Sequence, residues 1–278
     1  MIDLHTHTAF SDGTTTPEEN AVLAVAAGLT GLALTDHDTT DGWARMAAAC
    51  AAHGLVFVPG IELSAELDGM SVHVLGYGMD PGDAAFAAEC ARLRGERDRR
   101  ARVMTERLAA LGLPVTWEMV QAHAGDAPVG RPHLGAALVD AGVVADLDEA
   151  FDRWLGEDGP VHEPKRALHP VDAVALIGGA GGAAVLAHPG VTFGEPGAAE
   201  ALVEAMIAAG LAGLEADHPA HDAALTAAWR SAARGRGILI TGSSDFHGGR
   251  KSVRIGERAT PVHVVDALGE STRGGTRW

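Results

Sequence analysis

Histidine is unusually frequent in this chain, and most of the histidines fall where predicted strands end. The sequence has 14 histidines among 278 residues, but only two cysteines. His5 and His7 close an apolar run at the start of the chain, and residues two apart on a strand point to the same face. Both imidazoles can therefore reach one ion. A second pair with this spacing, Asp245 and His247, follows a later apolar run. Imidazole and carboxylate donors without thiolates suit zinc, manganese or iron.

The same pattern extends to nine possible metal ligands. His37, Glu62 and His188 each end an apolar run, Asp12 lies in the loop after the first run, and His73 lies within a predicted strand. In parallel α/β folds the carboxyl ends of the strands form one rim, where active sites lie. Nine donors exceed the need of one ion, so we expect two or three divalent ions (Mn, Fe or Zn). Their predicted ligands are His5, His7, Asp12, His37, Glu62, His73, His188, Asp245 and His247.

Alternating strand and helix patterns must position these residues. The first helix is predicted over 17–27, with Thr16 as its N-cap and Pro17 at its first position. Helices are predicted between most of the strands, which indicates an α/β fold with a parallel sheet or barrel. The predicted strands are 2–5, 31–36, 55–62, 72–76, 183–188, 213–216 and 238–241.

The alternation is interrupted in the middle of the chain, where the patterns are helical and no convincing strand occurs. The first helix of this region carries seven arginines between residues 92 and 107, interspersed with acidic residues. This pattern is typical of a solvated helix face, and a role in holding a polyanion is the alternative. The predicted organisation is a first barrel part (1–82), a helical insertion (83–165), a second barrel part (166–268) and a polar tail (269–278).

Composition limits the class of partner. The net charge of −16 argues against binding duplex DNA through a broad basic face. No uncharged apolar run reaches the roughly 18 residues of a membrane span. The first residues lack the basic region of a signal peptide. Because the chain has so few cysteines, a reducing compartment is the default, and we expect a cytoplasmic protein with no membrane partner.

The candidate ligands and their neighbours, in this order, resemble a known family. That family is the PHP family (polymerase and histidinol phosphatase) of metal-dependent phosphoesterases, and the resemblance spans nearly the whole chain. Within the family, the chain is similar to the stand-alone bacterial branch. Members of that branch remove the 3′-phosphate from nucleoside 3′,5′-bisphosphates, and some trim short RNA from its 5′ end. The segments that carry the resemblance are His5-x-His7, Asp12, Thr35–Asp38, Pro59–Glu62, His73, Arg131–His133, His188–Gly190 and Asp245–His247.

The resemblance implies a distorted seven-stranded (βα) TIM-like barrel with a helical insertion and a trinuclear metal site. It would give the first ion the ligands His5, His7, Glu62 and Asp245. The second ion would share Glu62 as a bridge and add His73 and His188. The third would take Asp12, His37 and His247.

The resemblance also suggests which residues act on the substrate. Arg131 and His133 would lean over the site and bind phosphate, which suits the bidentate grip of a guanidinium. His218, at the end of a predicted strand, would bind phosphate or protonate the leaving oxygen. These three are the expected catalytic and substrate-binding residues. Glu215 and Asp217 are expected to orient neighbouring residues. Asp36 and Asp38, which flank His37, are expected to accept imidazole N–H groups.

The expected protein is therefore a metal-dependent phosphoric ester hydrolase that acts through metal-bound hydroxide. Its expected substrate is a nucleoside 3′,5′-bisphosphate and, beyond that, short 5′-phosphorylated RNA. One Tyr, six Phe and five Trp offer few surfaces for stacking a base, which tempers the nucleotide assignment. Three alternatives stay open: a phosphatase of histidinol phosphate or another small phosphomonoester, a metal-dependent amidohydrolase on an eight-stranded barrel, and a non-catalytic module.

Overall fold

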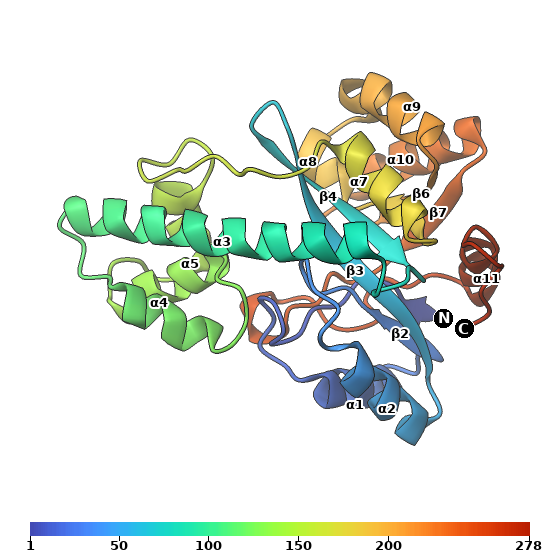
Figure 1. Ribbon diagram of the computed structural model, residues 1–278, viewed down its shortest axis with the longest axis horizontal. Helices are drawn as coiled ribbons and strands as arrows, with labels where there is room; N and C mark the ends of the chain where they lie inside the picture. The colour runs from blue at the N-terminus through green and yellow to red at the C-terminus, as the bar shows by residue number, and fades with distance from the viewer.

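The computed structural model describes residues 1–278 and shows one sheet of seven strands that nearly closes into a barrel (Figure 1). The strands follow one another in chain order. This confirms the predicted α/β barrel of seven strands. The strands are β1 (Ile2–Asp3), β2 (Gly31–Leu34), β3 (Val56–Leu67), β4 (Met70–Tyr77), β5 (Ala183–Leu186), β6 (Leu211–Asp217) and β7 (Leu239–Gly242).

Helices cover the outside of the barrel. Figure 1 shows α1 and α2 on one side of the sheet and α7, α9 and α10 on the other. As predicted, Thr16 caps α1: its hydroxyl accepts the Glu19 amide at 3.2 Å, and the Glu19 carboxylate accepts the Thr16 amide at 2.7 Å. The covering helices are α1 (Pro17–Ala26), α2 (Trp43–His53), α7 (Pro170–Gly179), α8 (Pro189–Phe193), α9 (Glu200–Ala208), α10 (Ala223–Arg236) and α11 (Val262–Glu270).

One strand departs from the parallel arrangement. β4 is antiparallel to both β3 and β5, whereas the other neighbouring strands are parallel. The reversal occurs at Asp68 and Gly69, which both have positive φ (49° and 86°), as a two-residue type I′ hairpin requires. The hairpin also makes both strands longer than the predicted 55–62 and 72–76. Because β4 runs backwards, its first half lies at the rim that the other strands reach with their carboxyl ends.

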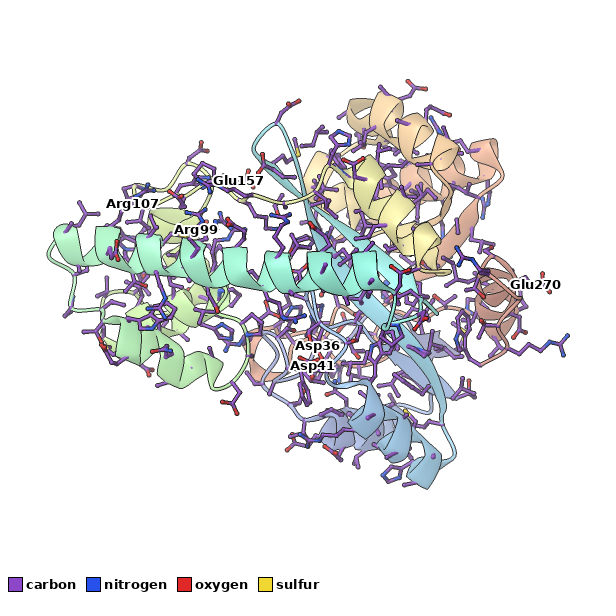
Figure 2. All side chains as sticks on the ribbon, viewed as in Figure 1. Asp36, Asp41, Arg99, Arg107, Glu157 and Glu270 are labelled. Atoms are coloured by element: carbon purple, nitrogen blue, oxygen red, sulfur yellow. The ribbon has the colours of Figure 1, made fainter.

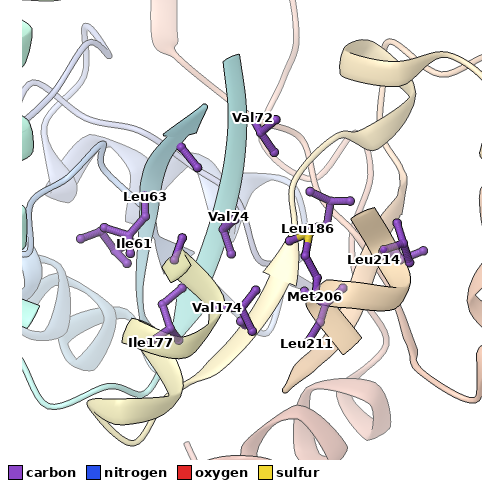
Figure 3. Close-up of a cluster of buried hydrophobic side chains, with 14 of the residues drawn as sticks. Ile61, Leu63, Val72, Val74, Val174, Ile177, Leu186, Met206, Leu211 and Leu214 are labelled. Carbon is purple, nitrogen blue, oxygen red and sulfur yellow. The ribbon is translucent and has the colours of Figure 1, made fainter. Parts of the chain in front are cut away.

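Successive side chains of β3 face either the hydrophobic core or the rim where the candidate ligands lie. Ile61 and Leu63 pack into a cluster with Val72 and Val74 of β4, Ile177 of α7 and other buried residues (Figure 3). Successive strand residues point to opposite faces, so Glu62 faces the barrel interior. The same two strands therefore supply both a core face and a site face.

Thr260 links the first and last strands of the sheet. Its amide and carbonyl exchange hydrogen bonds with Ile2 at 2.8 and 2.9 Å. Its hydroxyl donates to the Gly242 carbonyl at 2.8 Å and accepts the Gly242 amide at 2.9 Å. One buried threonine thus connects β1 to β7 and holds the start of segment 243–247, which carries two of the candidate ligands.

The residues between β4 and α7 form a helical lobe built on one long helix. α3 (Ala84–Ala110) starts against the barrel and continues beyond it, and the other lobe helices pack along its second half (Figure 1). Its first half contributes Phe86 and Leu93 to the barrel core, and its second half contributes Met104 and Leu108 to a separate lobe core. The other lobe helices are α4 (Trp117–Ala124), α5 (Arg131–Asp140), α6 (Leu147–Ala150) and a π-helix (Phe151–Leu155).

The end of the chain folds back onto the barrel. The segment expected as a polar tail starts within α11, and Trp278 packs against the hydrophobic cluster that contains Val265 and Leu268. Figure 1 shows both chain ends beside α11. None of the helices combines the length and apolar character that a membrane crossing requires.

We expect the substitution Thr260→Val to lower the free energy of unfolding by about 1–3 kcal/mol, because buried polar groups of Gly242 would lose their partner. Denaturant unfolding measures the change. Thr226→Val on α10 is the matched control, since the Thr226 side chain makes no hydrogen bond, and it should cost less than about 0.5 kcal/mol. Equal stability of the two variants would show that the strand link does not depend on this hydroxyl.

Candidate metal centre

The structure brings four of the candidate ligands to one point: His5 and His7 follow β1, Asp245 follows β7, and Glu62 lies within β3. The Nε2 atoms of His5 and His7 lie 3.0 Å apart, and each lies 3.1 Å from Glu62 Oε2. Asp245 Oδ1 lies 3.4 and 3.5 Å from the same two nitrogens. Donors that bind one ion at about 2.0–2.2 Å are themselves about 3–3.5 Å apart. The four donor atoms therefore have the separations of a single coordination sphere.

The second carboxylate oxygen of Glu62 faces two further imidazoles. Glu62 Oε1 lies 2.7 Å from His73 Nδ1 and 3.1 Å from His188 Nε2. His73 Nδ1 is buried and has no hydrogen bond of regular geometry, so it is a candidate donor to an ion beside Glu62. Glu62 thus faces two groups of donors, one with each oxygen. His73 reaches the rim from the first half of β4, which the reversal of that strand makes possible.

A third group surrounds Asp12. Its carboxylate oxygens lie 3.7 Å from His37 Nε2 and 3.4 Å from His247 Nε2. His7 Nδ1 lies 3.7 Å from Asp12 and joins this group by its second nitrogen. His37 Nδ1 lies 3.3 Å from Glu62 Oε2. His37 therefore lies between Glu62 and the third group, and all nine predicted ligands meet at one rim.

Charge explains why this cluster suits cations. Burial alone would lower the pKa of His7, but hydrogen bonds to Asp245 and Glu62 outweigh it and raise that pKa to about 9. Burial alone would raise the pKa of Glu62, but the imidazoles around it hold that pKa well below its usual range. The pKa of His73 falls to about 4, mainly by burial, so its ring is neutral. The buried carboxylates thus stay ionised and hold protons on neighbouring imidazoles, in the place that a metal ion can take.

Of the carboxylates expected to orient their neighbours, only that of Glu215 contacts a candidate ligand. Glu215 accepts His5 Nδ1–H at 3.0 Å and the His188 amide at 2.8 Å, as predicted for a residue that orients its neighbours. The prediction for Asp36 and Asp38 is wrong, because neither contacts an imidazole. Their partners are hydroxyl, amide and guanidinium groups: Asp36 binds Thr8 and Ser11, and Asp38 binds Ser64 and Arg97.

Three residues at the rim have backbone angles that L-amino acids rarely adopt. His188, Asp245 and Asp38 have φ of 26°, 54° and 58°. Such conformations cost about 1–3 kcal/mol each and persist where the surroundings hold them. Two of the three are candidate ligands. Other folding interactions therefore offset the strain that points these donors toward the cluster.

A cavity of about 280 Å³ lies between the cluster and the helical lobe. On the barrel side it is bordered by Asp12, His37, His73 and His247. The opposite wall comes from α3, the start of α5 and the π-helix. The basic side chains in its walls include Arg97, Arg100, Arg131, Lys165, Arg250 and Lys251.

Two of these basic side chains are paired with carboxylates: Arg97 binds Asp38 at 2.6 Å, and Lys251 binds Asp245. A seventh basic residue at the cavity, Arg166, is exposed. The other four are at least partly buried and donate to neutral oxygens at 2.6–3.3 Å, and Lys165 Nζ also lies 3.5 Å from His73 Nε2. Burial lowers the pKa of Arg100 to about 9 and that of Lys165 to about 7. The uncompensated pairs are Arg100 with the Glu163 carbonyl, Arg131 with the Leu155 carbonyl, Lys165 with the Ser71 hydroxyl and Arg250 with the Pro132 carbonyl.

Comparison with known proteins agrees with this chemistry. The family model of the PHP domain matches residues 3–107. A 3′,5′-nucleoside bisphosphate phosphatase from Chromobacterium violaceum is 36% identical over 247 residues, which cover 88% of this chain and 87% of that protein. The chain belongs to the PHP family. A 5′-3′ exoribonuclease from Salmonella typhimurium is 33% identical over 192 residues, 68% of this chain and 66% of that protein.

A solved structure shows the same architecture. A proposed metal-dependent phosphoesterase from Bifidobacterium adolescentis superposes with a TM-score of 0.91 at 34% identity, over 98% of this chain and 96% of that one. This PHP-family chain is thus a metal-dependent phosphoesterase. The amidohydrolase considered above was expected on an eight-stranded barrel, whereas here the sheet has seven strands.

The residues expected to act on substrate lie at different places around the PHP site. Arg131 lines the cavity, with its guanidinium 5.4 Å from the centre of the Phe151 ring. His133 is buried at the start of α5, where its Nδ1 accepts the Gly130 amide at 3.0 Å. His218 Nε2 lies 3.3 Å from Asp245 Oδ2. Neither histidine is among the residues that line the cavity, and their roles stay predictions.

Sequence reasoning missed most of the cavity's basic residues. Arg97 and Arg100 belong to the arginine run, but only the helix phase tells which arginines face the cavity. Lys165 and Lys251 had a simpler signal, because they are the only lysines in a chain of 278 residues and both lie at the site.

Metal binding to the metal-free protein at pH 7.5 should release protons. His7, with its pKa raised to about 9, is then protonated and must lose its proton to bind an ion. Affinity should therefore fall as the pH falls. Calorimetric titration with Mn²⁺ in two buffers of different ionisation enthalpy measures the number of protons. Identical heats in the two buffers would contradict this account of the cluster.

Proposed function

We propose that this chain removes the 3′-phosphate from nucleoside 3′,5′-bisphosphates, with short 5′-phosphorylated RNA as a further substrate. The observation that carries the proposal is one cavity that brings candidate metal ligands and unpaired basic side chains together. Donors of the cluster border it, and so do four basic side chains that are at least partly buried and have no carboxylate partner. A substrate with a phosphate at each end of a short linker fits this arrangement.

The four uncompensated cations support a second anionic group on the substrate, beside the one at the donor cluster. Buried cations without a counter-charge are costly, and an anionic ligand offsets that cost. Guanidinium groups in particular bind phosphate by two parallel hydrogen bonds. A substrate with only the reacting phosphate, which Arg131 would contact, would leave most of the other three cations, Arg100, Lys165 and Arg250, unpaired. The cavity therefore favours a bisphosphate over a simple monoester such as histidinol phosphate.

The donor groups fit two or three divalent ions. His5, His7, Glu62 and Asp245 would hold the first, Glu62 with His73 and His188 the second, and Asp12 with His37 and His247 the third. Mn, Fe and Zn all accept such imidazole and carboxylate donors. When bound, these ions supply a Lewis acid for the phosphoryl oxygens and a water that ionises near neutral pH.

The chain's own residues would then bind phosphate and hold protons. Arg131 would grip the substrate and neutralise charge that develops on phosphoryl oxygens. The His133 pKa, lowered to about 4 by burial, makes that ring neutral, and its Nδ1 accepts a backbone amide, so its proton is on Nε2. His218 has the same tautomer, because its Nδ1 accepts the Ala220 amide at 3.1 Å. Each histidine would thus offer an Nε2–H group, His133 to the phosphate and His218 to the leaving oxygen.

The substrate proposal is tested by phosphate release from a panel. With Mn²⁺ present, adenosine 3′,5′-bisphosphate should give the highest kcat/KM, above adenosine 3′-phosphate, adenosine 5′-phosphate and histidinol phosphate. Excess EDTA should abolish the activity and added Mn²⁺ should restore it. Equal rates on all compounds would refute the substrate proposal, and full activity in excess EDTA would refute metal dependence.

The role of Arg131 is tested by Arg131→Met with Arg102→Met as its control. Both guanidinium groups lie over an aromatic ring in the helical lobe, Arg131 over Phe151 and Arg102 over Trp117, but only Arg131 lines the cavity. Loss of a charged hydrogen bond costs about 1.5–3 kcal/mol, so kcat/KM for the bisphosphate should fall roughly ten- to a hundredfold. The control should keep wild-type kinetics. If both variants lose activity equally, the effect comes from the lobe's structure and not from phosphate contact.

A further inference from the structure

The segment that returns from the lobe to the barrel is not held in place by hydrogen bonds between main-chain groups. Residues 163–167 belong to no helix or strand and make no hydrogen bond to other main-chain groups. Lys165, in the middle of this segment, is one of the four uncompensated cations of the cavity. Its position must therefore be set by side chains packed against the segment.

Those side chains come from the arginine-rich helix α3. Arg92 donates to the Arg166 carbonyl at 2.9 Å, Arg100 to the Glu163 carbonyl at 2.6 Å, and Arg107 to the His162 carbonyl. Residues spaced by seven, eight and fifteen positions share one face of a helix. Figure 2 shows Arg99 and Arg107 along the same edge of α3. These arginines thus bind the protein's own main chain, although Arg92 and Arg107 stay partly exposed, and neither expectation from the sequence included such contacts.

Glu163 is where these contacts converge. Its carboxylate accepts Arg99 at 2.8 Å and Arg107 at 2.7 Å, while its carbonyl accepts Arg100. The residue therefore joins three arginines of α3 to the segment two positions before Lys165. Arg100 is itself a cavity cation, so Glu163 contacts one cation of the cavity directly and lies two residues from another. Neither the Glu163 nor the Arg107 side chain lines the cavity.

We propose that Glu163 is a positioning residue for the second phosphate of the substrate: it fixes the return segment on α3 and so holds Lys165 and Arg100 in place at the cavity wall. The inference rests on the proposed function, since it takes the second phosphate to bind at these cations. It assigns the arginine run a part in substrate affinity without contact between most of its members and the substrate.

If Glu163 acted only through its negative charge, its substitution would raise the affinity for an anion instead of lowering it. Removal of a negative charge beside a cationic cavity should strengthen the binding of an anion. Loss of a positioning contact should weaken it, because the cations lose their pre-set geometry. The sign of the change in anion affinity therefore separates the two explanations.

The test compares Glu163→Gln with Glu89→Gln in the full-length, Mn²⁺-loaded protein. Glu89 is the matched control, because it also pairs with an arginine of α3, Arg92, but neither lines the cavity nor contacts residues 163–167. We expect Glu163→Gln to raise KM for adenosine 3′,5′-bisphosphate by about tenfold with kcat within about twofold, and to leave the kinetics on adenosine 3′-phosphate unchanged. Glu89→Gln should match the wild type.

A binding measurement makes the test independent of turnover. Calorimetry with adenosine 5′-phosphate, which carries only the second phosphate, should show about tenfold weaker binding to Glu163→Gln than to the wild type. Arg107→Gln, which removes contacts to the same segment from outside the cavity, should weaken binding in the same direction and replaces Glu163→Gln if that variant does not fold.

Wild-type or tighter binding by these variants would overturn the proposal, and so would a wild-type protein that does not bind adenosine 5′-phosphate. Absence of bisphosphate hydrolysis by the wild type would overturn the proposed function, while this binding comparison would still decide the role of Glu163.

Discussion

The structure depends most on one buried carboxylate. Glu62 is 1% exposed and lies 2.7–3.3 Å from five imidazoles, which come from the ends of β1, β2 and β5 and from within β4. A buried charge of this kind is strongly unfavourable unless surrounding groups compensate it. Neutral imidazoles orient the carboxylate but do not cancel its charge. The rim is therefore arranged around a negative charge that protons or metal ions must balance, and the strands take the positions that bring their histidines to it.

The opposite charge comes from the helical lobe and the loops near it. The chain as a whole carries a net charge of −16, yet both of its lysines and several of its arginines gather at one cavity. Overall charge is thus a poor guide to the substrate of this protein. The barrel supplies the donors that suit cations. The basic side chains come from α3, α5 and the return segment, and from the loop after β7, which contributes Arg250 and Lys251. The two halves of the site meet only because the lobe lies over the rim.

The sequence predicted the donor half of the site well and the cationic half poorly, for a physical reason. Ligands such as His5 and His7 follow the period of two and lie just past a strand end, so local pattern is enough to place them. The only sequence signal for the reversal of β4 is the pair Asp68-Gly69, which is typical of a tight hairpin turn. Lys165 and Arg100 owe their positions to the path of an extended segment against a helix, which is a tertiary contact. Asp36 and Asp38 show the same limit, because adjacency to His37 did not reveal which groups they bind.

The placement of α3 across two hydrophobic cores has a consequence for how the chain folds. The lobe core gathers residues between 101 and 161, close in sequence, whereas the barrel must join β4 to β5 across about a hundred intervening residues. Contacts between residues close in sequence form at a smaller entropic cost than distant ones. We therefore expect the lobe to gain structure early, with α3 as a preformed edge onto which the two barrel parts assemble. The donor cluster draws on both parts, so the capture of metal belongs to the last stage of folding.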